Sequence, residues 1–228
     1  WYETYAHSNH PSARMAWVLK QLIKRPYQLG PLGEGNKLYG SPRPLVRTDA
    51  FDCMTLLNTT LAFAFAKKLN DYMPTLLDLR YHQSIIHFLT RRHFVSIDWN
   101  PHLTKTYPLI DITLTQTTPT LPHQTLRCTL HRNQWLQKRA PIYYQFAKAN
   151  HSLFPNNNAI ALSYIPKNKL TLKQTLRTLA QRMPHGGLFE VVRKQWPNPK
   201  LTGTYIAVSH VGAIVIRNHT LWVIHASS

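Results

Sequence analysis

The stretch from residue 51 to residue 66, FDCMTLLNTTLAFAFA, places one of only two cysteines directly behind an aspartate and ahead of a strongly apolar run. The run predicts a helix that is apolar on nearly all sides, which is typical of a helix buried in the core. Asp52 is expected to be its N-cap, with side-chain oxygens that accept hydrogen bonds from the amides of Met54 or Thr55. Cys53 would then occupy the first turn of a rigid, buried helix.

Two interpretations of this cysteine are open. Free backbone N–H groups and the positive end of the helix dipole favour a thiolate at a helix start, so Cys53 is a candidate nucleophile. The structural alternative is that Cys53 is a small buried apolar residue, as most free cysteines are. Cys128 has neither a helix start nor a histidine-bearing strand around it, and we expect a buried structural thiol there.

The end of the chain predicts a β-hairpin that carries two histidines. Two alternating segments flank a polar turn at residues 217–219. A two-residue loop at 217–218 would put His210 directly opposite His225, whereas a loop at 218–219 would make them diagonal neighbours on one face. A three-residue loop would put them on opposite faces. Two of the three registers therefore bring together a base and an orienting partner for a thiol nucleophile.

The order of the other segments indicates an α+β fold, with a helical layer packed on an antiparallel sheet. With 228 residues, the chain is expected to form one domain, residues 1–228, with helices and loops in 1–105 and a β-rich half in 106–228. A punctuated loop is expected over residues 25–50. The remaining predictions are helices at 11–24, 75–90 and 169–182 and strands at 109–115 and 187–193.

The charge balance favours anionic partners. There are 27 Lys and Arg residues against 9 Asp and Glu residues, a formal charge of +18. The basic residues are scattered in runs of at most two, which leaves nucleic acid, anionic lipid headgroups and acidic polysaccharides or peptides as possible partners. The longest apolar stretch is well short of the ~20 residues that a membrane-spanning helix needs, so no membrane span is expected.

Several motifs, in this order, carry a resemblance to a known family. They are FDCMT at residues 51–55, RRHFVSIDWN at 91–100, LIDITL at 109–114, SHVG at 209–212 and IHAS at 224–227. Together they resemble the N-acetylmuramoyl-L-alanine amidase group of the NlpC-type, papain-like bacterial cell-wall cysteine hydrolases. The resemblance runs from about residue 12 to the end of the chain.

The resemblance implies a papain-like fold with a partial barrel and a catalytic triad. Cys53 would be the nucleophile, His210 the general base and acid, and His225 the third member, which holds the imidazole of His210 in position. Four residues would bind substrate: Tyr39, Arg92, His93 and Trp99.

The implied activity is hydrolysis of the amide between N-acetylmuramic acid and L-alanine, in peptidoglycan or its soluble fragments. No cofactor is expected, and no histidine pair here is completed by a carboxylate or cysteine at the spacing of a metal site. A monomer is expected, in the periplasm or secreted, with an N-terminal signal already removed from a chain that starts at Trp1.

Two alternatives stay open. One is an endopeptidase of the same superfamily that cuts the bond between γ-D-glutamate and the diamino acid. The other, from a different class, is a non-catalytic basic module that binds nucleic acid or anionic surfaces through its +18 charge.

Overall fold

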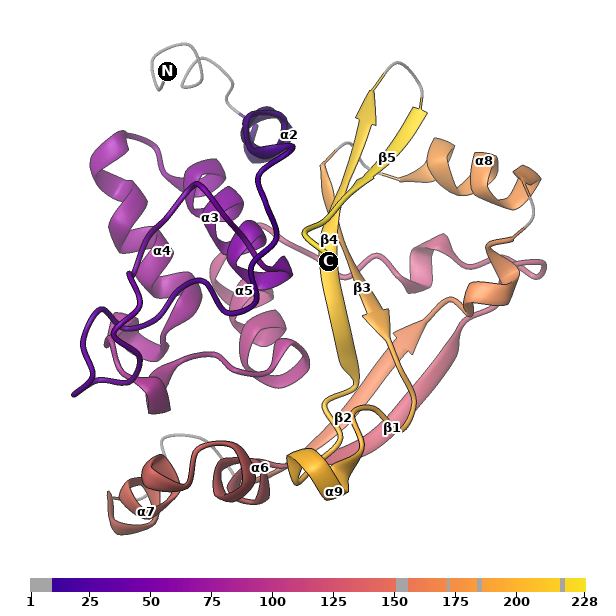
Figure 1. The fold of residues 1–228 in the computed structure, drawn as a ribbon. Helices are drawn as coiled ribbons and strands as arrows, with labels where there is room; N and C mark the ends of the chain where they lie inside the picture. Colours follow the sequence, from indigo (N-terminus) through magenta and orange to yellow (C-terminus); the bar gives the residue numbers. More distant parts are fainter. Residues whose placement is uncertain (1–9, 151–155, 172, 184–185, 218–219) are drawn as a thin grey trace. The chain divides into compact units, whose positions relative to one another are not determined.

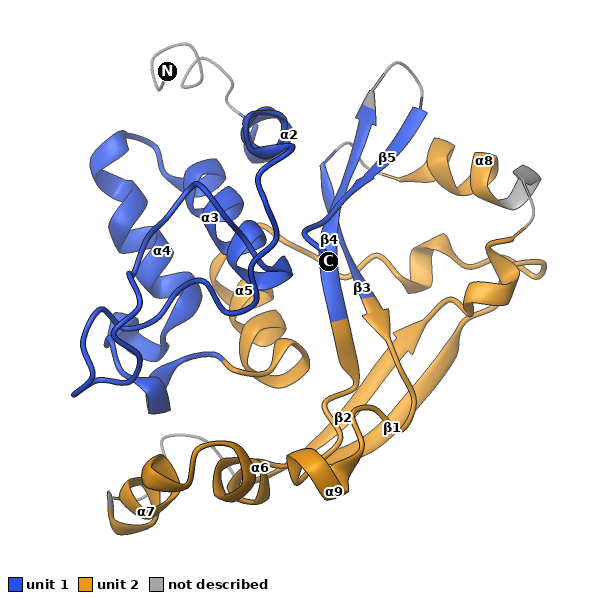
Figure 2. Cartoon of the chain, viewed as in Figure 1, with its two compact units in different colours: residues 1–92, 184–190, 210–228 blue, residues 93–183, 191–209 orange. Residues whose placement is uncertain are grey.

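The computed structural model describes residues 10–150, 156–171, 173–183, 186–217 and 220–228. The chain divides into two compact units (Figure 2). The first comprises residues 1–92, 184–190 and 210–228, and the second comprises residues 93–183 and 191–209. A single domain across the whole chain stays a prediction.

The first unit is built around the helix that the opening stretch predicted. This helix, α3 (Cys53–Phe65), buries nine of its thirteen residues, and α2 (Pro11–Leu22) and α4 (Tyr72–Arg80) both contact it (Figure 1). Because α3 is covered on more than one side, it is apolar around most of its circumference. The rings of Phe63 and Tyr72 stack with centroids 4.1 Å apart and join α3 to α4. The prediction of a buried helix that starts at Cys53 is confirmed.

The helix predicted over residues 75–90 is shorter than expected. It ends at Arg80, where an isolated β-bridge joins Tyr81 to Arg91. Gln83 and Ser84 then adopt positive φ values of 53° and 57°, which an α-helix cannot accommodate. Two 3₁₀ turns, His82–Ser84 and Phe88–Thr90, replace the second half of the predicted helix.

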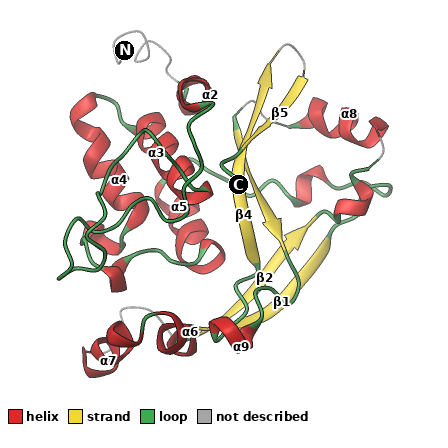
Figure 3. Ribbon diagram, in the orientation of Figure 1, coloured by secondary structure: helices red, strands yellow, loops and turns green. Residues whose placement is uncertain are grey.

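The strands form two separate sheets (Figure 3). The order β3-β4-β5 joins β3 (Gly187–Val192), β4 (Val208–Arg217) and β5 (Thr220–Ile224), and β1 (Gln124–His131) pairs antiparallel with β2 (Asn157–Tyr164). The α+β class is therefore confirmed, and the strands of the described residues do not close into a barrel.

The second unit has a core gathered from segments far apart in sequence. Phe94, Leu130, Ile160 and Ala207 form a buried cluster, each at most 4% exposed. Five helices belong to this unit: α5 (Asn100–Thr106), α6 (Arg132–Arg139), α7 (Pro141–Asn150), α8 (Lys173–Arg182) and α9 (Pro199–Thr202). None of the helices among the described residues is both long enough and apolar enough to cross a membrane.

The prediction of a strand over residues 109–115 is wrong. Asp111 Oδ1 accepts a hydrogen bond of 2.8 Å from the amide of Thr113, and a 3₁₀ turn follows at Leu114–Gln116. An aspartate that bonds the backbone two residues on favours a turn over an extended strand.

A buried ion pair ties the core cluster to α6. Arg132 donates to both carboxylate oxygens of Asp98, at 2.6 and 3.2 Å, and the two side chains are 4% and 1% exposed. Asp98 Oδ2 also accepts from the amide of Phe94, and the guanidinium of Arg132 lies 4.9 Å from the Phe94 ring centroid. Removal of either partner would leave a buried, uncompensated charge.

Replacement of Asp98 by alanine is therefore expected to lower the free energy of unfolding by about 3–5 kcal/mol. The matched control is Asp49→Ala, which breaks the exposed Arg47–Asp49 pair and should leave stability almost unchanged. Urea unfolding followed by tryptophan fluorescence measures both. Equal, small effects for the two variants would contradict a structural role for the buried pair.

Candidate functional site

The candidate nucleophile lies at the first residue of α3, in the first unit. Cys53 is half-buried and forms no disulfide. Hydrogen bonding from the backbone of Val211, and to a smaller extent from the backbone of Met54 and of Cys53 itself, lowers the pKa of its thiol. Since Val211 follows His210 on β4, this contact brings the start of the helix to the strand that carries the candidate base.

Asp52 fixes the start of the helix, as the sequence predicted. Its Oδ1 accepts from the amide of Thr55 at 2.8 Å, and the Thr55 hydroxyl accepts from the amide of Asp52 at 2.9 Å. This reciprocal pair is a capping box, which satisfies donors that the first turn would otherwise leave unpaired. The second oxygen, Oδ2, accepts from the amide of Gly30 at 3.0 Å and so ties the preceding loop to the helix.

The surroundings of Cys53 hold its proton on the sulfur. Burial is the largest influence and raises the pKa of the Cys53 thiol. The backbone of Val211 lowers that pKa in part, whereas the charge of Asp52 raises it further. Desolvation of the thiolate therefore outweighs the stabilisation that the helix start was expected to provide.

The two histidines meet in the second of the registers that the sequence allowed. Ala213 pairs with Ile224 and Arg217 with Thr220, so the same register carried one pair further sets Gly212 opposite His225. His210 and His225 are then diagonal neighbours on one face. The tip of the hairpin, residues 218–219, lies outside the described residues, but the paired strands on either side fix the register.

The imidazole rings contact each other edge to face. Nε2 of His210 lies 3.1 Å from Nδ1 of His225, and the ring planes meet at 88° with centroids 4.9 Å apart. Phe189 on β3 lies 6.4 Å, between centroids, from each imidazole. All three rings belong to the first unit, as does Cys53.

Gly212 provides the space in which this ring cluster sits. A Cβ at this position would lie 2.9 Å from the Cβ of His225, and it would clash more severely with the edge of the Phe189 ring. A side chain here would therefore push His225 and the ring of Phe189 away from the strand. Sequence reasoning noted the SHVG motif but did not predict this requirement for glycine.

Glu34 is a further residue that sequence reasoning missed. It is 2% exposed, and it holds together the loop that precedes α3. Its Oε2 accepts from the amide of Ser41 at 2.7 Å, and its Oε1 accepts from Nε of Arg91 at 2.8 Å and from the hydroxyl of Tyr81 at 3.3 Å. The sequence signal was one acidic residue within the glycine-rich residues 30–40.

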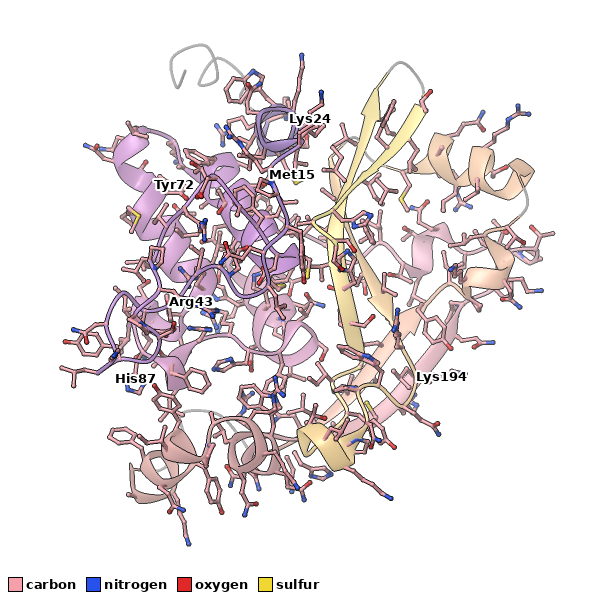
Figure 4. All side chains as sticks on the ribbon, viewed as in Figure 1. Met15, Lys24, Arg43, Tyr72, His87 and Lys194 are labelled. Carbon is pink, nitrogen blue, oxygen red and sulfur yellow. The ribbon has the colours of Figure 1, made fainter. Side chains whose placement is uncertain are left out.

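The same loop is anchored at several other points. Arg80 of α4 donates to the carbonyl of Gly33 at 3.1 Å, and Arg43 donates to the carbonyl of Gly30. Figure 4 shows Arg43 among the side chains of this loop and Tyr72 at the start of α4. The loop is therefore an ordered support for the candidate nucleophile, as the glycines and prolines of residues 25–50 suggested.

The four predicted substrate-binding residues fall into different environments. Tyr39 is 49% exposed, and its carbonyl accepts from the amide of Phe88. Arg92, also in the first unit, directs Nε to the carbonyl of Asp78 at 3.4 Å. In the second unit, His93 packs against Trp135 at 4.7 Å, and Trp99 is 1% exposed. Trp99 thus offers no open ring face to a sugar.

Two other expectations concern the remaining cysteine and metals. Cys128 is half-buried on β1, where it packs against the core cluster of the second unit, and burial raises its pKa. It is more exposed than predicted but otherwise fits a structural thiol. Across the described part of the chain, no three His, Cys, Asp or Glu side chains are grouped closely enough to hold a metal ion.

Solved structures with this fold come from several bacteria. A protein from Legionella pneumophila, assigned to the family DUF1460, matches with a TM-score of 0.87 and 26% identity over 100% of this chain and 81% of its own. An N-acetylmuramoyl-L-alanine amidase from Bacteroides uniformis matches with a TM-score of 0.63 and 18% identity over 95% and 85%. A candidate xylanase from Bacteroides fragilis is similar at 0.61 and 19%, over 92% and 86%.

Identities below 25% establish the shared fold and no more. No curated protein sequence matches this chain. The sequence model of one family, however, matches residues 18–228, nearly the whole chain and all of the site described above. The chain therefore belongs to the N-acetylmuramoyl-L-alanine amidase-like family.

Proposed function

We propose that this protein is a thiol-dependent amidase that hydrolyses the bond between N-acetylmuramic acid and L-alanine in peptidoglycan or its fragments. The observation that carries the proposal is that Cys53, at the capped start of a buried helix, is influenced by the backbone of Val211, which follows His210 on β4, and that the imidazole of His210 contacts that of His225. Membership of the amidase-like family supports the same reaction. We also propose that the chain is related to the papain-like, NlpC-type hydrolases, which this arrangement supports.

The hydrogen bond between the histidines sets their protonation. For His210 to act as a base toward sulfur through Nδ1, its proton must be on Nε2, which then donates to Nδ1 of His225 at 3.1 Å. His225 therefore acts as a neutral acceptor, with its own proton on Nε2. It still accepts that hydrogen bond when His210 becomes an imidazolium, and so it stabilises the charge formed during the reaction.

The first chemical step forms a thioester. His210 takes the thiol proton as the sulfur of Cys53 attacks the lactyl carbonyl carbon of N-acetylmuramic acid. The amides of Cys53 and Met54, which lie against the sulfur, donate to the oxyanion of the tetrahedral intermediate. The carbon–nitrogen bond then breaks, and His210 returns the proton to the amine of L-alanine, which leaves.

The second step regenerates the enzyme. His210, neutral again, removes a proton from a water molecule that attacks the thioester carbonyl, and the sulfur leaves and recovers its proton. Because burial keeps the resting thiol protonated, transfer of its proton to His210 belongs to the activation step rather than to the resting state.

Substrate binding and location follow from the same proposal. Tyr39 and Arg92 of the first unit would contact substrate, with arginine as the partner for a peptide carboxylate, and a substrate contact of His93 stays a prediction. Trp99 is buried and is not given a direct contact. A cell-wall substrate places the protein in the periplasm or outside the cell, where we expect it to act as a monomer.

Removal of the nucleophile tests the proposal directly. Cys53→Ala is expected to reduce release of peptide from muropeptides by at least ~10³-fold. Cys128→Ala removes the other thiol and should retain activity. Mass spectrometry of the digest identifies the bond, because an amidase releases the intact stem peptide from the sugar, whereas an endopeptidase leaves a dipeptide attached. Equal product from wild type and Cys53→Ala would reject a thiol mechanism.

The role of Asp52 predicts a shift in thiol reactivity. Asparagine at position 52 keeps an oxygen that can cap α3 but removes the charge that raises the pKa of Cys53. The pH profile of Cys53 alkylation by iodoacetamide, which in wild type should lie above that of free cysteine, is expected to move to lower pH. Asp71→Asn removes a carboxylate that does not act on this thiol and is the matched control. An unchanged or upward shift for Asp52→Asn would contradict this account.

Because little room remains around Gly212, a larger residue at this position is expected to displace the rings of His225 and Phe189. Gly212→Ala forces the added Cβ against His225 and Phe189, and kcat/KM is expected to fall by about tenfold to a hundredfold. The control, Ile214→Val on the same strand, should cost about 0.5–1.5 kcal/mol of stability with little loss of activity. Thermal unfolding and muropeptide kinetics measure both variants. The positioning role is lost if Gly212→Ala is as active as the control.

A further inference from the structure

The net charge is unevenly divided between the two units. Within the ranges of the second unit there are fourteen Lys and Arg residues but only two acidic residues, a formal charge of +12 out of the +18 of the chain. Asp98 is one of these two, and it is buried against Arg132. Asp111 is therefore the only other carboxylate side chain to balance the remaining thirteen cations of this unit.

Within this unit, the exposure of side chains on α7 is the reverse of the usual pattern for a surface helix, because large apolar side chains are exposed and a small one is buried. Its buried side chain is the small Ala147, which is 5% exposed, whereas Ile142 and Phe146 are 75% and 53% exposed. These two large side chains are four residues apart and so lie on the same face of the helix. Ala149, one turn further along that face, is also exposed. An exposed apolar stripe of this kind is typical of an interaction surface.

Cations surround the apolar stripe. Lys138 and Arg139, in the last turn of α6, and Lys148 on α7 are all exposed. The two helices contact each other (Figure 1) and are separated only by Ala140, whose carbonyl accepts from the amides of Tyr143 and Tyr144. The cations and the apolar side chains therefore come from one compact helical corner.

We propose that this corner is a docking face for a lipid bilayer with anionic headgroups. The docking face consists of Lys138, Arg139, Ile142, Phe146 and Lys148. Exposed Ile and Phe on one helix face insert at the boundary between headgroups and acyl chains, and flanking Lys and Arg pair with anionic headgroups. The protein would lie on the membrane surface, since none of the described helices can span it.

Charge complementarity favours a bilayer over other partners. A protein partner would have to carry a nearly uniform acidic surface to match this unit, whereas an anionic bilayer provides uniform negative charge over its whole area. Nucleic acid also provides that charge, but it has no apolar layer to cover an aliphatic side chain such as Ile142. The combination of an apolar stripe with unbalanced cations is what selects the membrane.

Vesicle sedimentation of the full chain tests this proposal. Wild type is expected to bind vesicles of phosphatidylglycerol and phosphatidylcholine, to bind pure phosphatidylcholine at least tenfold more weakly, and to be released by high salt. The double variant Ile142→Ser, Phe146→Ser should lose at least tenfold in partitioning. Replacement of Lys138, Arg139 or Lys148 by glutamine should each cost ~fivefold. The control is Leu201→Ser, which removes a side chain that is 72% exposed on α9 of the same unit and should bind as wild type does.

Two results would overturn the proposal. One is equal binding of wild type to neutral and anionic vesicles. The other is vesicle binding by the double variant equal to that of Leu201→Ser.

Docking and catalysis are separable in this experiment. Cys53→Ala should bind vesicles as wild type does, and the double variant should cleave soluble muropeptides at the wild-type rate. Failure of the amidase proposal would therefore leave the vesicle result intact, and the reverse also holds.

Discussion

The site depends on one carboxylate that makes two connections. Asp52 caps α3 through Thr55 and holds the loop before the helix through Gly30, so a single side chain sets where the helix begins and what lies beside its first turn. A cap of this kind contributes ~1 kcal/mol to stability. It also places a negative charge next to the thiol and raises its pKa. In the proposed mechanism, the cap gives a rigidly held thiol at the cost of a less acidic one, and His210 would compensate by removing the proton during attack.

What the sequence could predict follows from how local each interaction is. The cap links residues three apart, so the pattern FDCMT contains both partners. The second bond of Asp52 goes to Gly30, twenty-two residues earlier, and no local pattern indicates it. The hairpin lies between these two cases, because the sequence predicts its strands but not their register. Alternation identifies both strands, and with them a set of three registers, but the observed one is fixed by the pairing of residues 213–217 with 220–224 rather than by a distinctive turn sequence.

The second unit shows where local patterns fail. Its core side chains come from positions 94, 130, 160 and 207, so each segment contributes too little apolar surface to stand out. The strands β1 and β2 are half exposed and contain many polar residues, so their sequences lack a clear strand pattern, and neither strand was predicted. Conversely, residues 109–115 alternate like a strand but form none, because a side-chain bond within the segment stabilises a turn instead. Alternation indicates a strand only where another strand is available to pair with it.

The acidic residues explain why so much positive charge remains for ligands. At least six of the nine accept a hydrogen bond from this chain: Glu34, Asp49, Asp52, Asp71, Asp98 and Asp111. Most of these bonds cap turns or helices or anchor loops, and therefore use backbone amides rather than cations as donors. Three of these carboxylates also pair with an arginine: Asp49 with Arg47, Glu34 with Arg91 and Asp98 with Arg132. With 27 Lys and Arg residues against 9 Asp and Glu residues, most of the positive field of the chain is still left uncompensated, which suits the proposed substrate with its peptide carboxylates and the proposed anionic bilayer.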